Sequence, residues 1–135
     1  MKKKKSKSEE ADTQENPFEL LHRVFHEPSR LAIMSAVAQE SKGVKFRDLR
    51  DECNLTDGNL NRHLKTLEEA GAVKIKKKFV DSKPQTTIHI TRNGEESFLE
   101  YLQALQHVLV NAAESLGADE LVDGLPMNLG KLAEG

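Results

Sequence analysis

The chain has 135 residues, of which 37% are hydrophobic and 31% are charged, and its formal net charge is −2. This length suffices for one modest hydrophobic core with tails but hardly for two. Because the sequence contains no run of 18 apolar residues and no apolar segment behind its N-terminal lysines, we expect no membrane span, no signal peptide and a cytoplasmic location.

The charge is unevenly distributed. Residues 1–41 hold seven basic and seven acidic side chains, so their net charge is 0. Residues 42–92 hold twelve basic and seven acidic side chains, a net charge of +5, and residues 93–135 hold one basic and eight acidic, a net charge of −7. A basic middle next to an acidic end confines any anion binding to the middle.

Residues 1–15 are polar and highly charged, so we expect a disordered tail. Its lysines are interpreted as an aid to solubility, with contact to DNA phosphates as the alternative. An ordered domain is expected over residues 16–116. Asn16 and Pro17 are typical of a helix start, and this first helix should end near Glu27 because Pro28 disfavours helical geometry in the residue before it. A second helix is expected to follow, over residues 31–40.

A short strand is expected at residues 44–46, and a third helix should run from there to about Cys53. Thr56 is a good N-cap and Gly71 is typical of a helix end, which predicts a fourth helix over residues 56–70. A short helix followed within about three residues by another is the helix-turn-helix layout.

The helix over residues 56–70 has an apolar stripe of Leu60, Leu64 and Leu67, which leaves a polar opposite face. Asn, Arg and Lys side chains can donate to base edges and phosphates, although an ordinary amphipathic helix has the same pattern. A glycine in this helix either permits close approach to DNA or is tolerated in the first turn. The candidate DNA contacts of this helix are Thr56, Gly58, Asn59, Asn61, Arg62 and Lys65.

After Gly71 the apolar residues recur at every second position, which is typical of strands. This pattern predicts a hairpin with strands at about residues 73–79 and 86–91 and a long polar loop at residues 81–84. Phe79 is expected to face inward with Val73 and Ile75. The lysines of this hairpin are interpreted as contacts to phosphates or the minor groove, or alternatively as a solvated strand edge. The basic side chains around the start of the third helix are interpreted as contacts to phosphates. These candidates are Lys42, Lys45, Arg47, Lys76, Lys78 and Lys83.

A long helix is predicted over residues 95–116, with an apolar seam at spacings of 4-3-4-3-4. Such a seam favours self-association as a homodimer; the alternative is packing onto the first helix of the same chain. The acidic segment 117–135 has no assigned role. The candidate dimer residues are Phe18, Leu21, Phe98, Leu102, Leu105, Leu109, Ala112 and Leu116.

Other potential sites are weaker. The single Cys53 is interpreted as a packed residue, with redox sensing as the alternative. His22 and His26 lie four residues apart, but a third metal ligand is not evident apart from His107, so we expect no metal site. No glycine-rich phosphate loop or nucleophile motif is present, and we expect neither enzymatic activity nor a cofactor.

Two residues are interpreted as parts of the scaffold. Arg30 is expected to form an ion pair with Glu68 or Glu69, and His63, beside the leucine stripe, is expected to be a half-buried packing residue.

The sequences PSRL at 28–31, FRDL at 46–49 and TRNG at 91–94, together with residues 55–71, resemble the compact winged-helix transcriptional regulators of prokaryotes, in the branch related to the ArsR and MarR families. The resemblance covers about residues 18–115. It implies a dimer formed by the terminal helices, with each recognition helix in a DNA major groove and each wing at the flanking minor groove or backbone. Residues 48–53 lack the cysteine-containing motif of the metal-sensing ArsR members, so metal sensing of that kind is not expected.

The sequence thus predicts a mostly α-helical α+β protein with a small β-hairpin wing, acting on double-stranded DNA as a dimeric regulator of transcription, with repression as the default. The alternative is a winged helix that serves as a protein–protein interaction module. A third possibility is a sensor of an unknown small molecule or of redox state that acts through the dimer interface.

Overall fold

A computed structural model describes residues 17–118 and residue 120. The predicted tail at residues 1–15 and almost all of segment 117–135 lie outside these residues. The expected α+β architecture is confirmed, and no helix in the described part of the chain is both long and apolar enough to cross a membrane. In chain order the elements are α2 (Pro17–Phe25), α3 (Pro28–Ala38), β1 (Val44–Lys45), α4 (Phe46–Glu52), α5 (Asp57–Glu69), β2 (Val73–Val80), β3 (Lys83–Ile90) and α6 (Arg92–Ser115).

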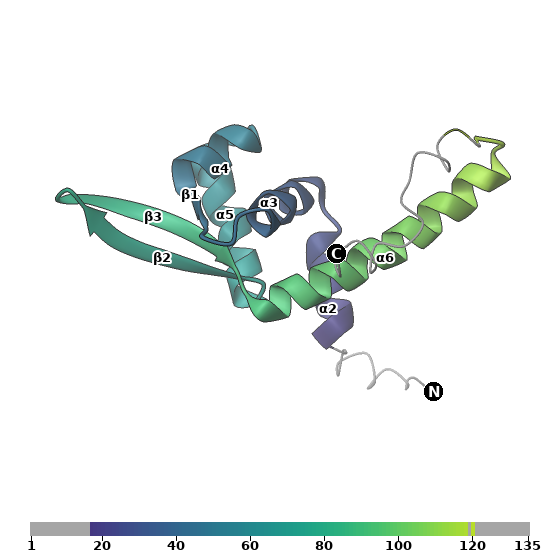
Figure 1. Ribbon diagram of the computed structural model, residues 1–135, viewed down its shortest axis with the longest axis horizontal. Helices are drawn as coiled ribbons and strands as arrows, with labels where there is room; N and C mark the ends of the chain where they lie inside the picture. Colours follow the sequence, from purple (N-terminus) through teal and green to yellow (C-terminus); the bar gives the residue numbers. More distant parts are fainter. Residues whose placement is uncertain (1–16, 119, 121–135) are drawn as a thin grey trace, which may run out of the picture.

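The three strands form an antiparallel sheet in the order β1-β3-β2, and β2 and β3 project from the helices as a long hairpin (Figure 1). The predicted long polar loop is wrong, because only Asp81 and Ser82 form the turn. Both have positive φ angles, 53° and 66°, which match the twist of a two-residue hairpin. Pro84 is therefore part of a strand, and it is tolerated there because that end of β3 has a neighbour on one side only.

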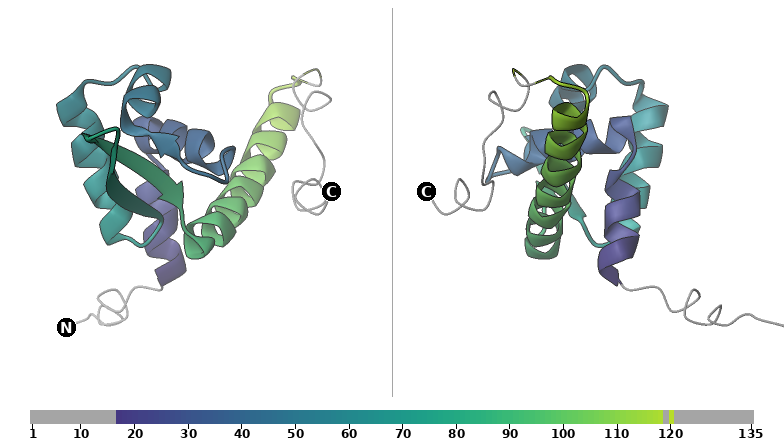
Figure 2. Two further views of the ribbon diagram at one scale, coloured as in Figure 1. Left: turned by 60° about the vertical axis from the view of Figure 1, so that its left-hand side comes forward. Right: turned by 90° about the vertical axis from the view of Figure 1, so that its right-hand side faces the viewer.

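One hydrophobic core joins the helices to the base of the sheet. Phe25 of α2 packs edge-on against Phe98 of α6, with ring centroids 5.2 Å apart. The first part of α6 crosses α2, and the rest of α6 extends away from the other elements (Figure 2). The largest fully buried side chains are Phe25, Ile33, Met34, Val37, Leu49, Leu60, Leu64, Leu67 and Ile88.

A tight joint links the end of α5 to the start of α6. The hydroxyl of Thr91 donates to the carbonyl of Gly71 at 2.7 Å and accepts from the amide of Gly94 at 2.8 Å. A Cβ atom on Gly94 would lie 2.1 Å from the carbonyl oxygen of Ala72, so only glycine fits this contact. Because Thr91 caps the helix, α6 begins at Arg92, three residues earlier than predicted.

Candidate nucleic-acid interface

Helix α5 presents the predicted polar face to solvent. Leu60, Leu64 and Leu67 are at most 1% exposed, so the core fixes the orientation of the helix. The hydroxyl of Thr56 accepts from the amide of Asn59 at 3.1 Å, which confirms the predicted N-cap. The remaining candidate contacts of this helix are all exposed: Gly58, Asn59, Asn61, Arg62 and Lys65.

Hydrogen bonds along this face hold its guanidinium and carboxylate groups in place. Arg62 donates from Nη2 to Oδ1 of Asn59 at 2.9 Å, so the two predicted base-reading side chains lie together. Asp57, in the first turn, accepts from Nη1 of Arg50 at 2.9 Å. This ion pair links α4 to α5 and partly neutralises an acidic group beside the exposed polar face of α5.

His63 anchors the inner side of α5 to the corner between α2 and α3. It is 6% exposed, so it is a packing residue as predicted but is buried more deeply than the half-buried position expected. Its Nδ1 lies 3.3 Å from Nη1 of Arg30 and 3.9 Å from a carboxylate oxygen of Glu27. Burial lowers the pKa of His63, and the attraction of Glu27 opposes this shift only partly. The neutral imidazole can therefore accept a hydrogen bond from the guanidinium.

The predicted ion pair of Arg30 with Glu68 or Glu69 is wrong. Arg30 instead donates from Nε to the backbone carbonyl of Val24 at 2.6 Å. Both glutamates are exposed near the C-terminal end of α5, whereas Arg30 meets the middle of that helix at His63.

One face of the sheet gathers lysines from two strands. By register, Lys76 and Lys45 both pair with Thr87, and the next pair on the same face joins Lys78 to Gln85. Together with Lys42, these lysines line a shallow groove of about 330 Å³. The pKa of the neighbouring His89 is lowered by burial and then by the lysine charges, so His89 adds no further positive charge near pH 7.

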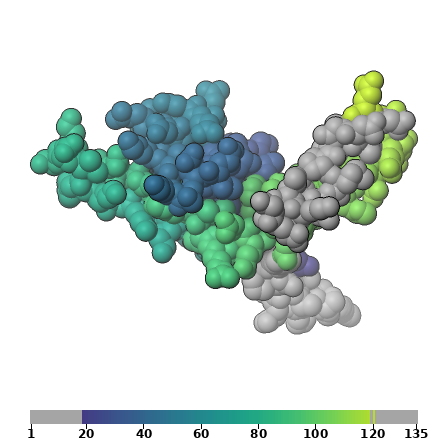
Figure 3. Space-filling model, in the orientation of Figure 1, coloured from purple at the N-terminus to yellow at the C-terminus, as the bar shows by residue number. Residues whose placement is uncertain are grey.

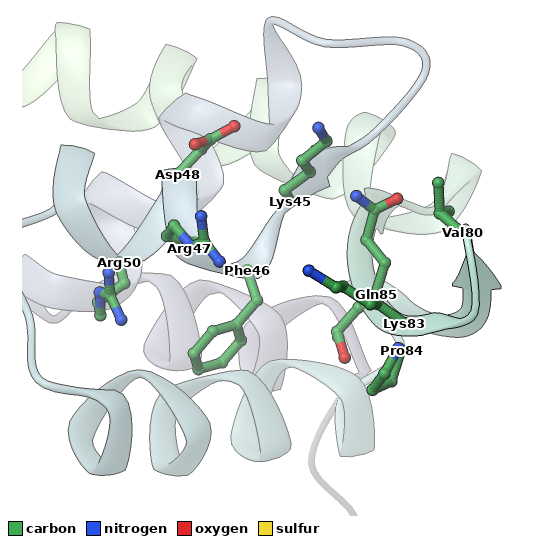
Figure 4. A pocket seen from close by; sticks show the side chains of 10 residues that line it. Lys45, Phe46, Arg47, Asp48, Arg50, Val80, Lys83, Pro84 and Gln85 are labelled. Atoms are coloured by element: carbon green, nitrogen blue, oxygen red, sulfur yellow. The ribbon is translucent and has the colours of Figure 1, made fainter.

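A second basic cleft lies between α4 and the hairpin, with a volume of about 480 Å³ (Figure 4). Lys45 and Arg47 line it from the helical side and Lys83 from the wing, so the structure brings three predicted residues together. Arg50 also lines it and was missed by the sequence prediction. Its hydrogen bonds to Asp57 and Asp51 depend on the packing of two helices, which no local pattern reveals.

The outer part of the wing differs from the prediction. Phe79 was expected to face inward, but 75% of its surface is exposed. The last hairpin pair that packs against the core is Ile75 with Ile88, and the strands continue beyond the point where the helices can cover them. Alternation of apolar and polar residues identifies the faces of a strand but not the distance over which a face is buried.

The predicted dimer seam divides into two parts. Leu21 and Phe98 are 4% exposed and lie within the core of one chain, as the alternative of packing onto the first helix required. Leu102 and Leu105 are partly buried against that core. The distal part remains open, with Leu109 40% and Leu116 83% exposed, beside Ala112 and Val108. Phe18 has a side chain outside the described set.

The remaining candidate groups are Cys53 and the histidines at positions 22 and 26. Burial raises the pKa of the Cys53 thiol, which disfavours the reactive thiolate. His26 Nδ1 lies 2.8 Å from the hydroxyl of Tyr101. Among the described residues, no group of three or more His, Cys, Asp or Glu side chains is arranged to hold a metal ion.

Comparisons with known proteins bear on this arrangement. The sequence model of the family described as "Winged helix DNA-binding domain" matches residues 29–109. The chain belongs to this winged-helix family. An uncharacterized protein of Methanocaldococcus jannaschii is 35% identical to this winged-helix chain over 89 residues, which cover 66% of this chain and 96% of the relative.

Solved winged-helix structures have a similar fold. A transcriptional regulator homologue from Pyrococcus horikoshii OT3 shares 27% identity at a TM-score of 0.63, over 78% of this chain and 98% of its own. MepR of S. aureus, solved as a DNA complex, shares 12% identity at a TM-score of 0.59, over 88% and 94% of the two chains. A MarR-family regulator from Rhodococcus shares 13% identity at a TM-score of 0.56, over 97% and 91%. These findings confirm the resemblance to winged-helix transcriptional regulators.

Proposed function

We propose that this chain is a dimeric, sequence-specific DNA-binding regulator of transcription, in which α5 reads the major groove and the hairpin β2–β3 contacts the flanking DNA. One observation carries the proposal. The outer face of α5 exposes Asn59, Asn61, Arg62 and Lys65 on a helix that the core holds rigidly, and a lysine-rich hairpin follows it directly.

The chemistry of this face suits base recognition. Arg can bridge O6 and N7 of guanine and Asn can pair with N6 and N7 of adenine, each worth about 1–3 kcal/mol of discrimination. Arg62 and Asn59 are already hydrogen-bonded to each other, so they would reach adjacent base edges as a unit. Lys45, Arg47 and Lys83, around the cleft of Figure 4, are suited to hold a DNA phosphate.

Selection of genomic fragments by the purified protein tests this function. We expect enrichment of a palindrome whose half-sites are about one helical turn apart, because a twofold dimer presents two recognition helices. Arg62→Ala and Lys65→Ala should each weaken binding to the enriched fragment. Arg92→Ala is the matched control, since Arg92 is exposed at the start of α6 and is hydrogen-bonded to Glu96. Unchanged affinity and sequence preference in both test variants would show that this face is not the reading face.

The dimer is proposed to form through the distal part of α6. Val108, Leu109 and Leu116 are exposed there at 59%, 40% and 83%. Val108→Glu combined with Leu109→Glu should give a monomer in analytical ultracentrifugation, because two charges would be buried without partners. A wild-type monomer at all concentrations would refute the dimer while leaving the reading face in place.

Repression is the proposed default, because a dimer that occupied a promoter would exclude polymerase. In vitro transcription from a promoter that contains the enriched palindrome tests the sign, and increased transcript would identify an activator. The alternative of a protein-interaction module predicts weak DNA binding without steep salt dependence, whereas several phosphate contacts make the logarithm of the affinity fall strongly with the logarithm of salt concentration.

A further inference from the structure

The tip of the wing carries an exposed apolar pair. Phe79 is 75% exposed, and its cross-strand partner Pro84 is exposed as well. Partners in register point to the same face of a hairpin, so the ring of Phe79 and the ring of Pro84 are neighbours. Neither is required by the core, and both leave apolar surface in water unless a ligand covers it.

We propose that Phe79 and Pro84 form an apolar wedge that enters the minor groove of the bound DNA, opens a base step and bends the duplex. The proposal rests on the DNA-binding function proposed above, and it assigns the wing a deforming role in addition to phosphate contact. Phe and Pro are among the side chains that minor-groove proteins insert between base steps, with kinks of about 20–90°.

The charge around the pair favours DNA over a protein as the occupant. Five lysines lie between residues 73 and 90, against one acidic residue, Asp81 in the turn. Lys78 directly precedes Phe79, and Lys83 directly precedes Pro84. An apolar pair set among cations is complementary to a groove with apolar base-step interiors and a strongly negative wall of phosphates.

The reach of the hairpin fits the same occupant. Phe79 lies four residues beyond Ile75, the last residue of β2 that packs against the core. At about 3.3 Å per residue, this overhang is roughly 13 Å. The minor groove next to a recognition helix lies about half of the ~34 Å DNA repeat away, or about 17 Å. The hairpin projects well beyond the helices that pack at its base (Figure 3).

The shape of the tip supports insertion. A two-residue turn at Asp81 and Ser82 keeps the end of the wing only two strands wide. Strands lie about 4.8 Å apart, close to the minor-groove width of about 6 Å. The side chains add to this width, so the groove must widen, which is what opening a base step achieves.

DNA bending by the full chain tests the proposal. The probe is the genomic fragment that the wild-type protein enriches, with the bend measured by fluorescence energy transfer between labelled ends and the opened step by 2-aminopurine fluorescence. We expect Phe79→Ala to lose most of the bend and the fluorescence increase, whereas Phe79→Leu, which keeps an apolar wedge, should retain both. Leu20→Ala is the control, because Leu20 is also a large exposed apolar side chain, at 42%, but lies on α2 and not on the hairpin.

The outcomes separate this inference from the function on which it rests. An unbent wild-type complex, or an equal bend in the Phe79→Ala complex, would overturn the wedge while leaving DNA recognition in place. The second result would also favour a protein as the occupant of the apolar pair. If the wild-type protein enriches no fragment, the DNA-binding function itself fails, and the wedge fails with it. Circular dichroism should show equal folding of all variants, because Phe79 and Leu20 lie outside the core.

Discussion

Helix α5 and the outer wing carry similar basic side chains, but the fold positions them by different means. Helix α5 buries Leu60, His63, Leu64 and Leu67, so packing fixes its rotation about its own axis. In the described hairpin, no side chain beyond the pair of Ile75 and Ile88 is buried, so that part depends on the backbone ladder and its two-residue turn more than on the core. A rigid helix suits the reading of base edges, whereas a ladder of exposed lysines suits contacts that depend on charge.

The largest expected difference between helix and wing is in the free energy of unfolding. Leu64→Ala should lower the free energy of unfolding by about 2–5 kcal/mol, because it removes a core side chain that is 1% exposed. Phe79→Ala should change it by less than about 0.5 kcal/mol, since its ring lies in solvent. Urea denaturation followed by circular dichroism measures both values. Similar losses in the two variants would contradict the contrast between helix and wing.

A substitution at the joint between α5 and α6 should lower the stability nearly as much. Gly94→Ala places a Cβ atom 2.1 Å from the carbonyl oxygen of Ala72, and the backbone must shift to accept it. We expect a loss of about 1–3 kcal/mol in the same denaturation assay. Gly58→Ala is the control, because nothing lies within 4 Å of its Cβ position, and it should gain about 0.5–1 kcal/mol. Equal stability of Gly94→Ala and wild type would show that the joint is not tight.

Salt dependence should separate the two regions in their contacts to DNA. Lys76→Ala and Lys78→Ala should each reduce the slope of log affinity against log salt by about 1, because each removes one phosphate contact. Asn59→Ala and Asn61→Ala should leave this slope unchanged while relaxing the base preference. Fluorescence anisotropy with matched and mismatched duplexes at several salt concentrations measures both. An altered slope in the asparagine variants would place phosphates, not bases, at α5.

The smallest expected effect is the pH dependence of stability that His63 on α5 causes. Burial lowers the pKa of His63 in the folded chain below its ordinary value of 6.5, so the unfolded chain binds more protons below that pH. Stability from the neutral imidazole is therefore complete above pH 6.5 and declines as the pH falls toward the lowered pKa. His89 shifts in the same direction.

A substitution of His63 isolates its own contribution to the pH dependence of stability. His63→Gln should lose less stability than wild type between about pH 7 and about pH 5, because glutamine does not titrate. Denaturation midpoints at several pH values measure the difference, and His89 is unchanged in both proteins. Identical pH profiles would show that His63 is not held neutral against Arg30.

Local signals in the sequence predicted most of the elements. Thr56 and Gly71 marked the ends of α5, and the structure has an N-cap at Thr56 and a positive φ of 82° at Gly71. The hairpin was predicted from alternation, but its turn was predicted too long. Asp and Ser can adopt positive φ only at some cost, so two such residues in succession were not anticipated.

The candidate site was predicted less completely. Exposure of Asn59, Asn61, Arg62 and Lys65 followed from the leucine stripe, because the helical period sets which side chains share a face. The contacts of Arg30 were predicted wrongly, and Arg50 was missed, because both depend on how separate helices meet. No spacing within a single helix contains that information.

The sequence by itself determined the order of helices and strands, the polar face of α5 and the concentration of positive charge in residues 42–92. These properties depend on neighbours within a few residues, where backbone geometry links spacing to direction. The tertiary structure alone decided where burial ends. It placed Phe98 in the core of one chain, left Leu116 and Phe79 in solvent, and brought Lys83 to the cleft beside Arg47. Burial depends on which surfaces meet, and those surfaces come from residues far apart in the chain.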